Sequence, residues 1–128
     1  MGEEASHARA GEGSSLNWVL GHVLSSRGRI LHMLGGDLGG LDVPHIRSMY
    51  ESKTRPDPTH ALPTADLLTK LEATQPALAS AIDAADLSAE IESPFGKQPL
   101  GDLLNFFAWH EGYPAGQTAI FKRLAESA

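Results

Sequence analysis

Apolar side chains recur at three- and four-residue steps in three long segments of the chain, a pattern that predicts three amphipathic helices. The first runs from Leu16 to Leu34, and Ser14 or Ser15 is suited to cap its start. Gly35 and Gly36 follow it, and glycine accepts the left-handed conformation that ends many helices. The apolar stripe of this helix consists of Leu16, Leu20, Val23, Leu24, Leu31 and Leu34.

The second and third helices lie in the other half of the chain. One is predicted to begin near Thr64, where Asp66 favours the positive end of the helix dipole. Pro76 inside it removes one backbone donor, so we expect a kink there. The last helix is predicted from near Pro99 to about Ala125, since proline suits the first helical position. The two stripes are Leu67, Leu71, Leu78 and Ile82, then Leu103, Phe107, His110, Pro114, Gln117, Phe121 and Leu124.

The remaining segments are rich in glycine, proline and charge. Residues 1–14 are predicted to be a loop or a disordered end, and residues 15–128 to form one helical domain. The stretch Gly35–Pro63 is predicted to be mostly loop, with a short helical turn around His45–Glu51. The one strand candidate, Glu90–Phe95, is short and ends near proline, so we expect no sheet. The predicted fold class is therefore all-α, with three helices where the commonest bundle has four.

Two glycines lie inside the first predicted helix. Gly21 and Gly28 are seven residues apart, and each costs roughly 1 kcal/mol relative to alanine. Two interpretations stay open. The helix either tolerates this weakness, or a neighbouring element approaches it closely along the glycine line.

Composition narrows the function classes. The chain has 128 residues, 41% of them hydrophobic, which suits one domain with one core. A formal net charge of -6 argues against nucleic acid as a partner. No apolar stretch approaches the ~18 residues that span a bilayer, and no secretory pattern opens the chain, so we expect a cytoplasmic protein without a membrane partner. There is no cysteine, so a metal would need histidine or oxygen ligands. There is no G-x-S-x-G elbow, so a serine hydrolase is disfavoured.

Histidine is the main candidate for chemistry. His110 falls within the apolar stripe of the last helix, where a lone histidine is more often structural than a ligand. His22 lies off the leucine stripe of the first helix and by itself indicates a surface or second-face residue. The other four lack partner spacing and are interpreted as solvated side chains: His7, His32, His45 and His60.

The sequence that follows His110 resembles a metalloprotease motif without completing it. His110–Pro114 reads HEGYP, whereas H-E-x-x-H needs a second histidine on the same helix face. Proline cannot coordinate a metal, so the zinc-peptidase interpretation fails. Pro114 also removes the N–H that would bond the carbonyl of His110, and Gly112 and Gly116 weaken the same turn. We therefore expect a kinked or locally opened helix between His110 and Gln117.

Two stretches taken together indicate a family. Ser15–His22 reads SLNWVLGH and His110–Gln117 reads HEGYPAGQ. They resemble N-s-l-x-W-x-x-G-H and H-E-x-Y-H-x-G-Q, two motifs of the DinB/YfiT-like superfamily, and the likeness covers the chain from about residue 12. The resemblance implies a DinB-like up-down helical bundle with a long crossover loop.

The same resemblance implies a metal site. Family members usually hold a divalent metal with three histidines, which makes His22 and His110 the candidate metal ligands here and places the third at Pro114, a departure from the pattern. The implied cofactor is zinc, nickel or iron. The implied activity is that of a metal-dependent thiol-S-transferase or hydrolase acting on a small-molecule substrate, with the metal deprotonating the thiol or a water.

Two hypotheses follow. The chain is either a metal-dependent enzyme with a substitute third ligand or water, or a non-catalytic bundle that binds a small molecule or serves as an oligomeric module. The substitutes would be Glu111, Gln117, or a histidine from the long loop, His45 or His60.

The family pattern also predicts a first helix ahead of Ser15, yet only the fourteen residues before it are available. Either the start lies upstream or the first helix is lacking. A bundle short of a helix exposes an apolar groove, so we expect a homodimer.

Overall fold

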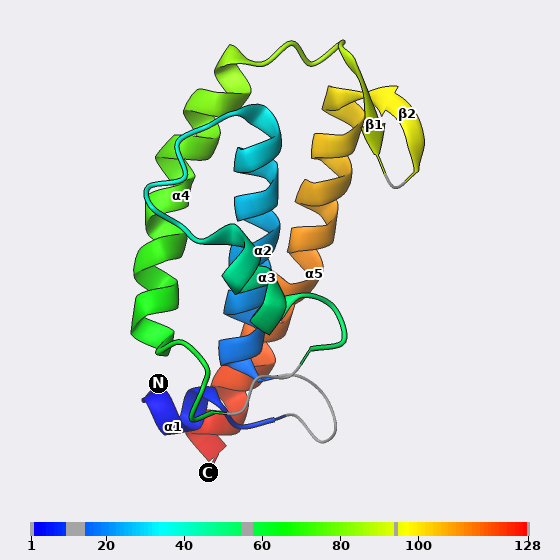
Figure 1. Ribbon diagram of the computed structural model, residues 1–128. Coiled ribbons are helices and arrows are strands. Elements are labelled where there is room, and N and C mark those ends of the chain that lie inside the picture. The colour runs from blue at the N-terminus through cyan, green and yellow to red at the C-terminus, as the bar shows by residue number, and fades with distance from the viewer. Residues whose placement is uncertain (1, 10–14, 55–57, 94, 128) are drawn as a thin grey trace.

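The computed structural model of the protein describes residues 2–9, 15–54, 58–93 and 95–127, with the side chains of 113–122 and 124–127 outside the description. Three long helices form its body: α2 (Leu16–Leu34), α4 (Thr64–Ala84) and α5 (Leu100–Ser127). Figure 1 shows α2 and α4 running in the same direction and α5 in the opposite one. Helix α2 packs against both of the others. The predicted helical bundle is thus confirmed.

Local sequence signals determine both ends of α2. The side chain of Ser15 accepts a hydrogen bond from the backbone N–H of Trp18 at 3.1 Å, a helix cap. At the other end Gly35 has a φ of 68°, and the N–H of Gly36 reaches the carbonyl of Leu31 at 2.8 Å. Three residues of the predicted stripe are buried and the rest are half-buried: Val23, Leu24 and Leu31, then Leu16, Leu20 and Leu34.

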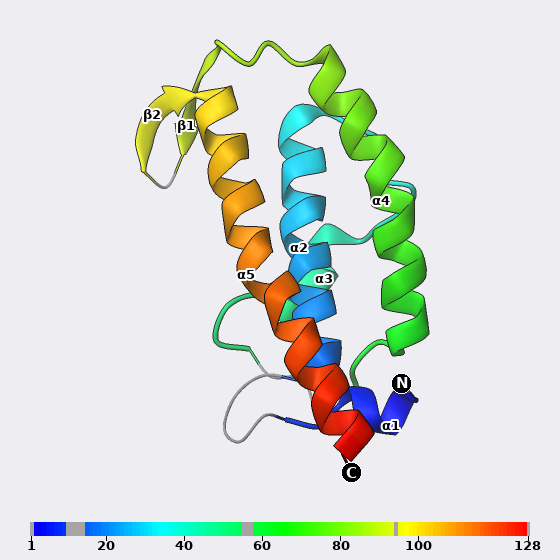
Figure 2. The same ribbon diagram turned by 180° about the vertical axis from the view of Figure 1, so that it is seen from behind.

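Because α2 and α4 are parallel, the chain between them must return along the length of the bundle. This crossover contains α3 (Val43–Tyr50), which begins after Asp42, whose side chain accepts from the N–H of His45 at 3.1 Å. The predicted helical turn is therefore a helix of eight residues. In Figure 1 α3 lies in front of α2, and Figure 2 shows α5 on the opposite side of it.

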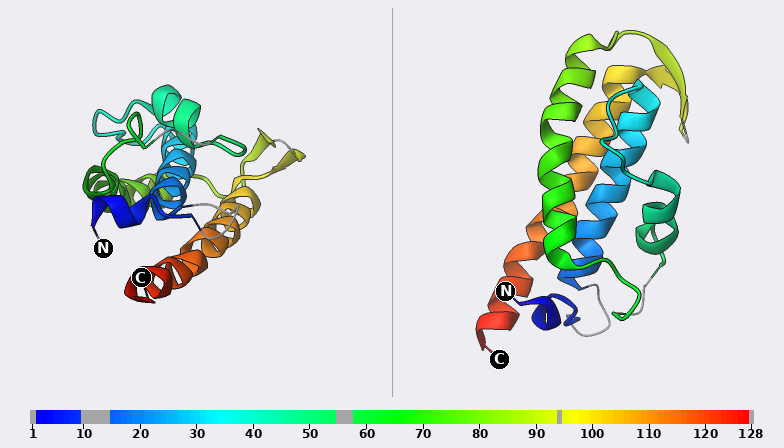
Figure 3. Two further views of the ribbon diagram at one scale, coloured as in Figure 1. Left: turned by 90° about the horizontal axis from the view of Figure 1, so that it is seen from below. Right: turned by 60° about the vertical axis from the view of Figure 1, so that its left-hand side comes forward.

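The core lies where α2, α3 and α4 meet. Leu24, Ile46, Tyr50 and Leu67 form one buried cluster, with Trp18 and other half-buried apolar side chains packed around it. The right-hand view of Figure 3 shows α3 beside α2 on the outside of the bundle. On the other side of α2, Leu100 and Leu103 of α5 are buried.

The two glycines of α2 are explained by the crossover. A β-carbon at Gly21 would overlap the ring of Tyr50. One at Gly28 would lie 3.1 Å from Val43 Cγ2 and 3.2 Å from Leu41 Cδ2, which is tight. The close-approach interpretation is therefore correct, and the approaching element is α3 with the loop before it.

A helical turn occupies part of the N-terminal segment that was predicted to be loop or disordered. Helix α1 (Glu3–Ser6) packs at the start of α4, and Ser6 is fully buried. Its hydroxyl lies 2.6 Å from the hydroxyl of Thr64, and a carboxylate oxygen of Glu3 accepts from the N–H of Thr64 at 2.8 Å. Since Pro63 offers α4 no side-chain cap, Glu3 does so from outside the helix.

The expectation of no sheet is wrong. Strands β1 (Glu90–Ser93) and β2 (Gly96–Pro99) pair in antiparallel register, Glu90 with Pro99 and Ser93 with Gly96. Gly96 has a φ of 94°, which permits the tight turn, and the Ser93 hydroxyl donates to its carbonyl at 2.9 Å. Strands of four residues are too short for alternation to reveal them.

Neither α4 nor α5 is interrupted at its proline. Helix α4 continues through Pro76, and α5 is unbroken from Leu100 to Ser127, so the expected local opening after His110 is not seen in the described backbone. Proline removes one hydrogen bond, while the turns on either side keep theirs. Ile82, predicted to be buried, is 37% exposed. Four side chains of the predicted last stripe lie outside the described residues: Pro114, Gln117, Phe121 and Leu124.

Within the part of the chain that the structure describes, no helix combines the length and the apolar character needed to cross a bilayer.

Candidate functional site

His22 is held in one orientation by contacts from α2 and α3. Its ring stacks on Trp18, one turn earlier, with centroids 4.7 Å apart and planes 10° apart. Its Nδ1 lies 2.8 Å from the backbone carbonyl of Tyr50. A carbonyl only accepts, so Nδ1 carries the proton and donates it. The lone pair of neutral His22 is therefore on Nε2, where a metal or a proton can bind.

His110 comes from α5 to meet this ring. The centroids of His22 and His110 are 5.7 Å apart, with the ring planes tilted by 53°. The ring centroid of Phe106, one turn earlier in α5, lies 6.0 Å from that of His110. Within the described part of the chain no hydrogen bond to His110 is formed, so its ring is bounded by aromatic surface and by His22. The structure thus brings the two sequence-predicted ligands together.

A buried polar network holds Tyr50 in place. The Tyr50 hydroxyl donates to Asn17 Oδ1 at 2.9 Å and accepts from the N–H of Leu62 at 3.0 Å. Asn17 in turn donates to the Leu62 carbonyl at 2.8 Å and to Thr64 Oγ1 at 2.9 Å. Burial raises the pKa of Tyr50, which keeps its hydroxyl protonated as a donor. The network fixes the residue whose carbonyl orients His22.

Glu111 forms an ion pair that links α5 to α2. Its carboxylate binds Arg27 of α2, with Oε1 2.6 Å from Nη2 and 3.1 Å from Nε. Arg27 also donates to Thr74 Oγ1 at 3.1 Å and to the Leu71 carbonyl at 3.4 Å, so it joins all three long helices. Both partners of the ion pair are mostly buried, at 19% and 28% exposure. Glu111 is therefore a structural residue and no substitute ligand.

The loop histidines do not reach the pair either. His45 is exposed on α3, and His60 is exposed with its Nδ1 3.2 Å from the hydroxyl of Thr59. Over the described residues, no group of three or more His, Cys, Asp or Glu side chains is placed to hold a metal. Pro114 and Gln117 have side chains outside that description. The described donor set is two imidazoles, whereas zinc sites use three or four protein ligands.

Sequence reasoning missed the residues that support this site. Tyr50 lay in a segment predicted to be mostly loop, and Arg27 was one of several scattered basic residues. The signals that could have found them were Gly21, which requires a close neighbour, and Asn17, a polar side chain at the start of an apolar helix. Each of these signals indicates that a neighbouring residue is present but does not identify that residue.

Comparison with known proteins agrees with this arrangement. The sequence profile of the DinB superfamily matches residues 1–117, which include every helix start and both histidines. Searches of curated proteins and of solved structures gave no match. A helical bundle with a crossover between parallel helices, and a match over most of its length, lead to one conclusion: the chain belongs to the DinB superfamily.

Proposed function

We propose that this chain binds a divalent metal ion weakly between His22 and His110 and presents it to a small-molecule ligand, with altered or reduced catalytic activity. The superfamily is generally metal-binding. The observation that carries the proposal is the pair itself: two imidazoles from different helices with centroids 5.7 Å apart, one with its tautomer selected by a backbone carbonyl.

The contact between His22 and Tyr50 is typical of a metal ligand. Ligating histidines almost always donate their other ring N–H to a carbonyl or carboxylate, which orients the ring and raises its basicity. Trp18 on one face of His22 restricts rotation of the ring further. Both contacts cost conformational freedom that a solvated histidine would keep.

The protein would contribute two ligands and an aromatic wall. His22 and His110 would hold the ion, while Phe106 and Trp18 exclude water from part of the site. A bound divalent metal would lower the pKa of a coordinated thiol or water. Glu111 is engaged by Arg27, so it is not available as a general base. Two ligands leave several coordination positions open, which favours exchange of small molecules over tight retention of the ion.

The test is metal content. After purification with zinc, nickel or iron supplied, we expect wild-type protein to retain metal clearly above background but below one equivalent, measured by mass spectrometry. The His22→Ala and His110→Ala variants should each retain none above background. His45→Ala, on the exposed face of α3, is the matched control and should behave as wild type.

Pro114→His tests whether the site lacks only one ligand. It restores the H-x-x-x-H spacing and should raise occupancy towards about one equivalent. Absence of metal from both the wild type and this variant would overturn the proposal.

A second function is favoured by one observation. No third donor joins the histidines within the described residues, which fits a non-catalytic bundle that binds a small molecule or a partner. Absence of metal from every variant, with the fold intact, would select this alternative.

A further inference from the structure

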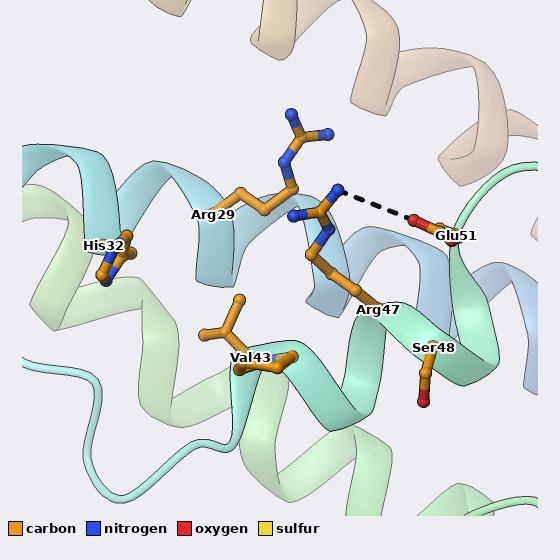
Figure 4. Close-up of a pocket in the computed structure, with 7 residues that line it drawn as sticks. Arg29, His32, Val43, Arg47, Ser48 and Glu51 are labelled. Atoms are coloured by element: carbon orange, nitrogen blue, oxygen red, sulfur yellow. Dashed lines mark ion pairs between the residues drawn. The ribbon is translucent and has the colours of Figure 1, made fainter.

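A cavity lies in the seam between α2 and α3. It has a volume of about 530 Å³, and its walls come from both helices. Figure 4 shows the lining residues that carry charge or apolar surface: Arg29, His32, Val43, Arg47 and Glu51. Pockets of ~300–1,000 Å³ commonly hold small molecules.

Two arginines line this cavity. Arg29 extends from α2 and Arg47 from α3 (Figure 4). Arg29 makes no hydrogen bond or ion pair within the described part of the chain. Arg47 is paired with Glu51, at an Nη2–Oε2 distance of 3.6 Å, and both are about half exposed. Such exposed pairs contribute only ~0–1 kcal/mol, so Glu51 holds Arg47 weakly.

Two cations that line one cavity repel each other unless an anion lies between them. Glu51 supplies one negative charge against the two arginines, and His32 also lines the cavity. Glu92 lines a neighbouring small cavity with Arg29 but forms no ion pair with it. The charged side chains that line this cavity are two arginines against one glutamate, so its lining is net positive in a chain whose formal net charge is -6. This concentration of positive charge is a specific feature and not a property of the whole surface.

We infer that this cavity binds the carboxylate or phosphate group of a small molecule. The planar forks of Arg29 and Arg47 match the paired oxygens of such groups and can bind them bidentately. The apolar surfaces of Val43 and Pro44 offer a floor for the rest of the molecule. The hydroxyl of Ser48 already donates to the His45 carbonyl at 2.6 Å, so recognition rests on the arginines. The inference does not depend on metal binding at His22 and His110.

Nuclear magnetic resonance of the full chain tests it. Phenyl phosphate and benzoate serve as anionic probes, and benzyl alcohol as the uncharged one, at constant ionic strength. We expect saturable shifts of the Nε–H signals of Arg29 and Arg47 with a Kd of about 1 mM or tighter for at least one anion. The anion that binds more tightly identifies the preferred group.

Charge variants assign the effect to the cavity. Arg29→Gln and Arg47→Gln should each weaken binding of that anion ~10-fold or more. Glu51→Gln should tighten it, because Arg47 loses its competing partner. Arg123→Gln is the matched control, since it removes the same charge from an exposed position near the end of α5. The residues changed are all on the surface, so each variant's spectrum should keep the wild-type dispersion.

Three results would each overturn the inference. One is the absence of saturable shifts with both anions. Another is equal affinity for benzyl alcohol, which would make the cavity merely apolar. The last is a loss in Arg123→Gln as large as that in Arg29→Gln, which would indicate non-specific attraction to positive charge.

Discussion

The ring of Tyr50 lies directly against the backbone of Gly21, with no room for a β-carbon between them. This contact holds α3 against α2 at Gly21, the residue directly before His22. It allows the carbonyl of Tyr50 to reach His22 Nδ1 at 2.8 Å. The packing of the crossover and the orientation of a candidate ligand are therefore one arrangement.

Replacing Gly21 tests that packing. Gly21→Ala gains helix propensity of about 1 kcal/mol but overlaps the buried Tyr50 ring, and overpacking costs typically ~1–3 kcal/mol. We expect net destabilisation in urea unfolding. Gly112→Ala is the matched control, because nothing lies within 4 Å of its new β-carbon, and it should be neutral or stabilising. If the two variants had equal stability, Tyr50 would not be confined by Gly21.

Removing the hydroxyl of Tyr50 tests the polar network. Tyr50→Phe keeps the ring and the carbonyl but leaves Asn17 Oδ1 and the N–H of Leu62 each without one partner. An unsatisfied buried group costs ~1–3 kcal/mol and two are left, so we expect a loss of about 2–6 kcal/mol in unfolding free energy. The His22 Nδ1 proton should persist in the ¹⁵N spectrum, because its acceptor is backbone. Wild-type stability would show that the network is not formed.

The ion pair between Arg27 and Glu111 should be strongly coupled. A double-mutant cycle with Arg27→Met and Glu111→Gln is expected to give a coupling of about 1–3 kcal/mol, since the two side chains are largely buried. The cycle for Arg47 and Glu51, about half exposed, is the comparison and should give ~0–1 kcal/mol. Equal couplings would mean that Arg27 does not join the helices as described.

Acid should release the cap that α1 provides to α4. Burial opposes ionisation of Glu3, but hydrogen bonds from the backbone of Thr64 and from His7 lower its pKa below the ordinary 4.5. A depressed folded-state pKa stabilises the fold above the unfolded value, and this contribution disappears as pH falls through the folded value. The stability difference between wild type and Glu3→Gln should therefore be largest near neutral pH and shrink below about pH 4.5.

Thermal unfolding over this pH range measures the effect. Glu4→Gln removes the same charge from the exposed neighbour and should change stability little at any pH. A pH-independent difference for Glu3→Gln would contradict the capping role.

Elements with many periods were predictable, and short ones were not. The three long helices repeat an apolar pattern over several turns, so their approximate ends and the serine cap of α2 followed from sequence. Helix α1 and the hairpin have four residues per element, too few for periodicity, and depend on tertiary contacts such as that between Ser6 and Thr64.

The candidate site was likewise predictable from the sequence only in part. Periodicity placed His110 towards the core but set His22 apart on a second face, and only the family motifs joined them. Their meeting depends on how α5 packs against α2, a property of the bundle and not of either helix. Tyr50 could not be predicted as the partner of His22, because the two residues are 28 positions apart in the chain.

The parallel course of α2 and α4 has a consequence for engineering. Short loops between antiparallel helices connect ends and contribute nothing along the helix sides. A connection that must return the whole length of a bundle can instead place backbone and side-chain groups against the sides of the helices. Here it delivers a backbone acceptor to one histidine and a guanidinium to the seam cavity. Shortening this segment to simplify the protein would therefore remove functional groups, even where every long helix survived.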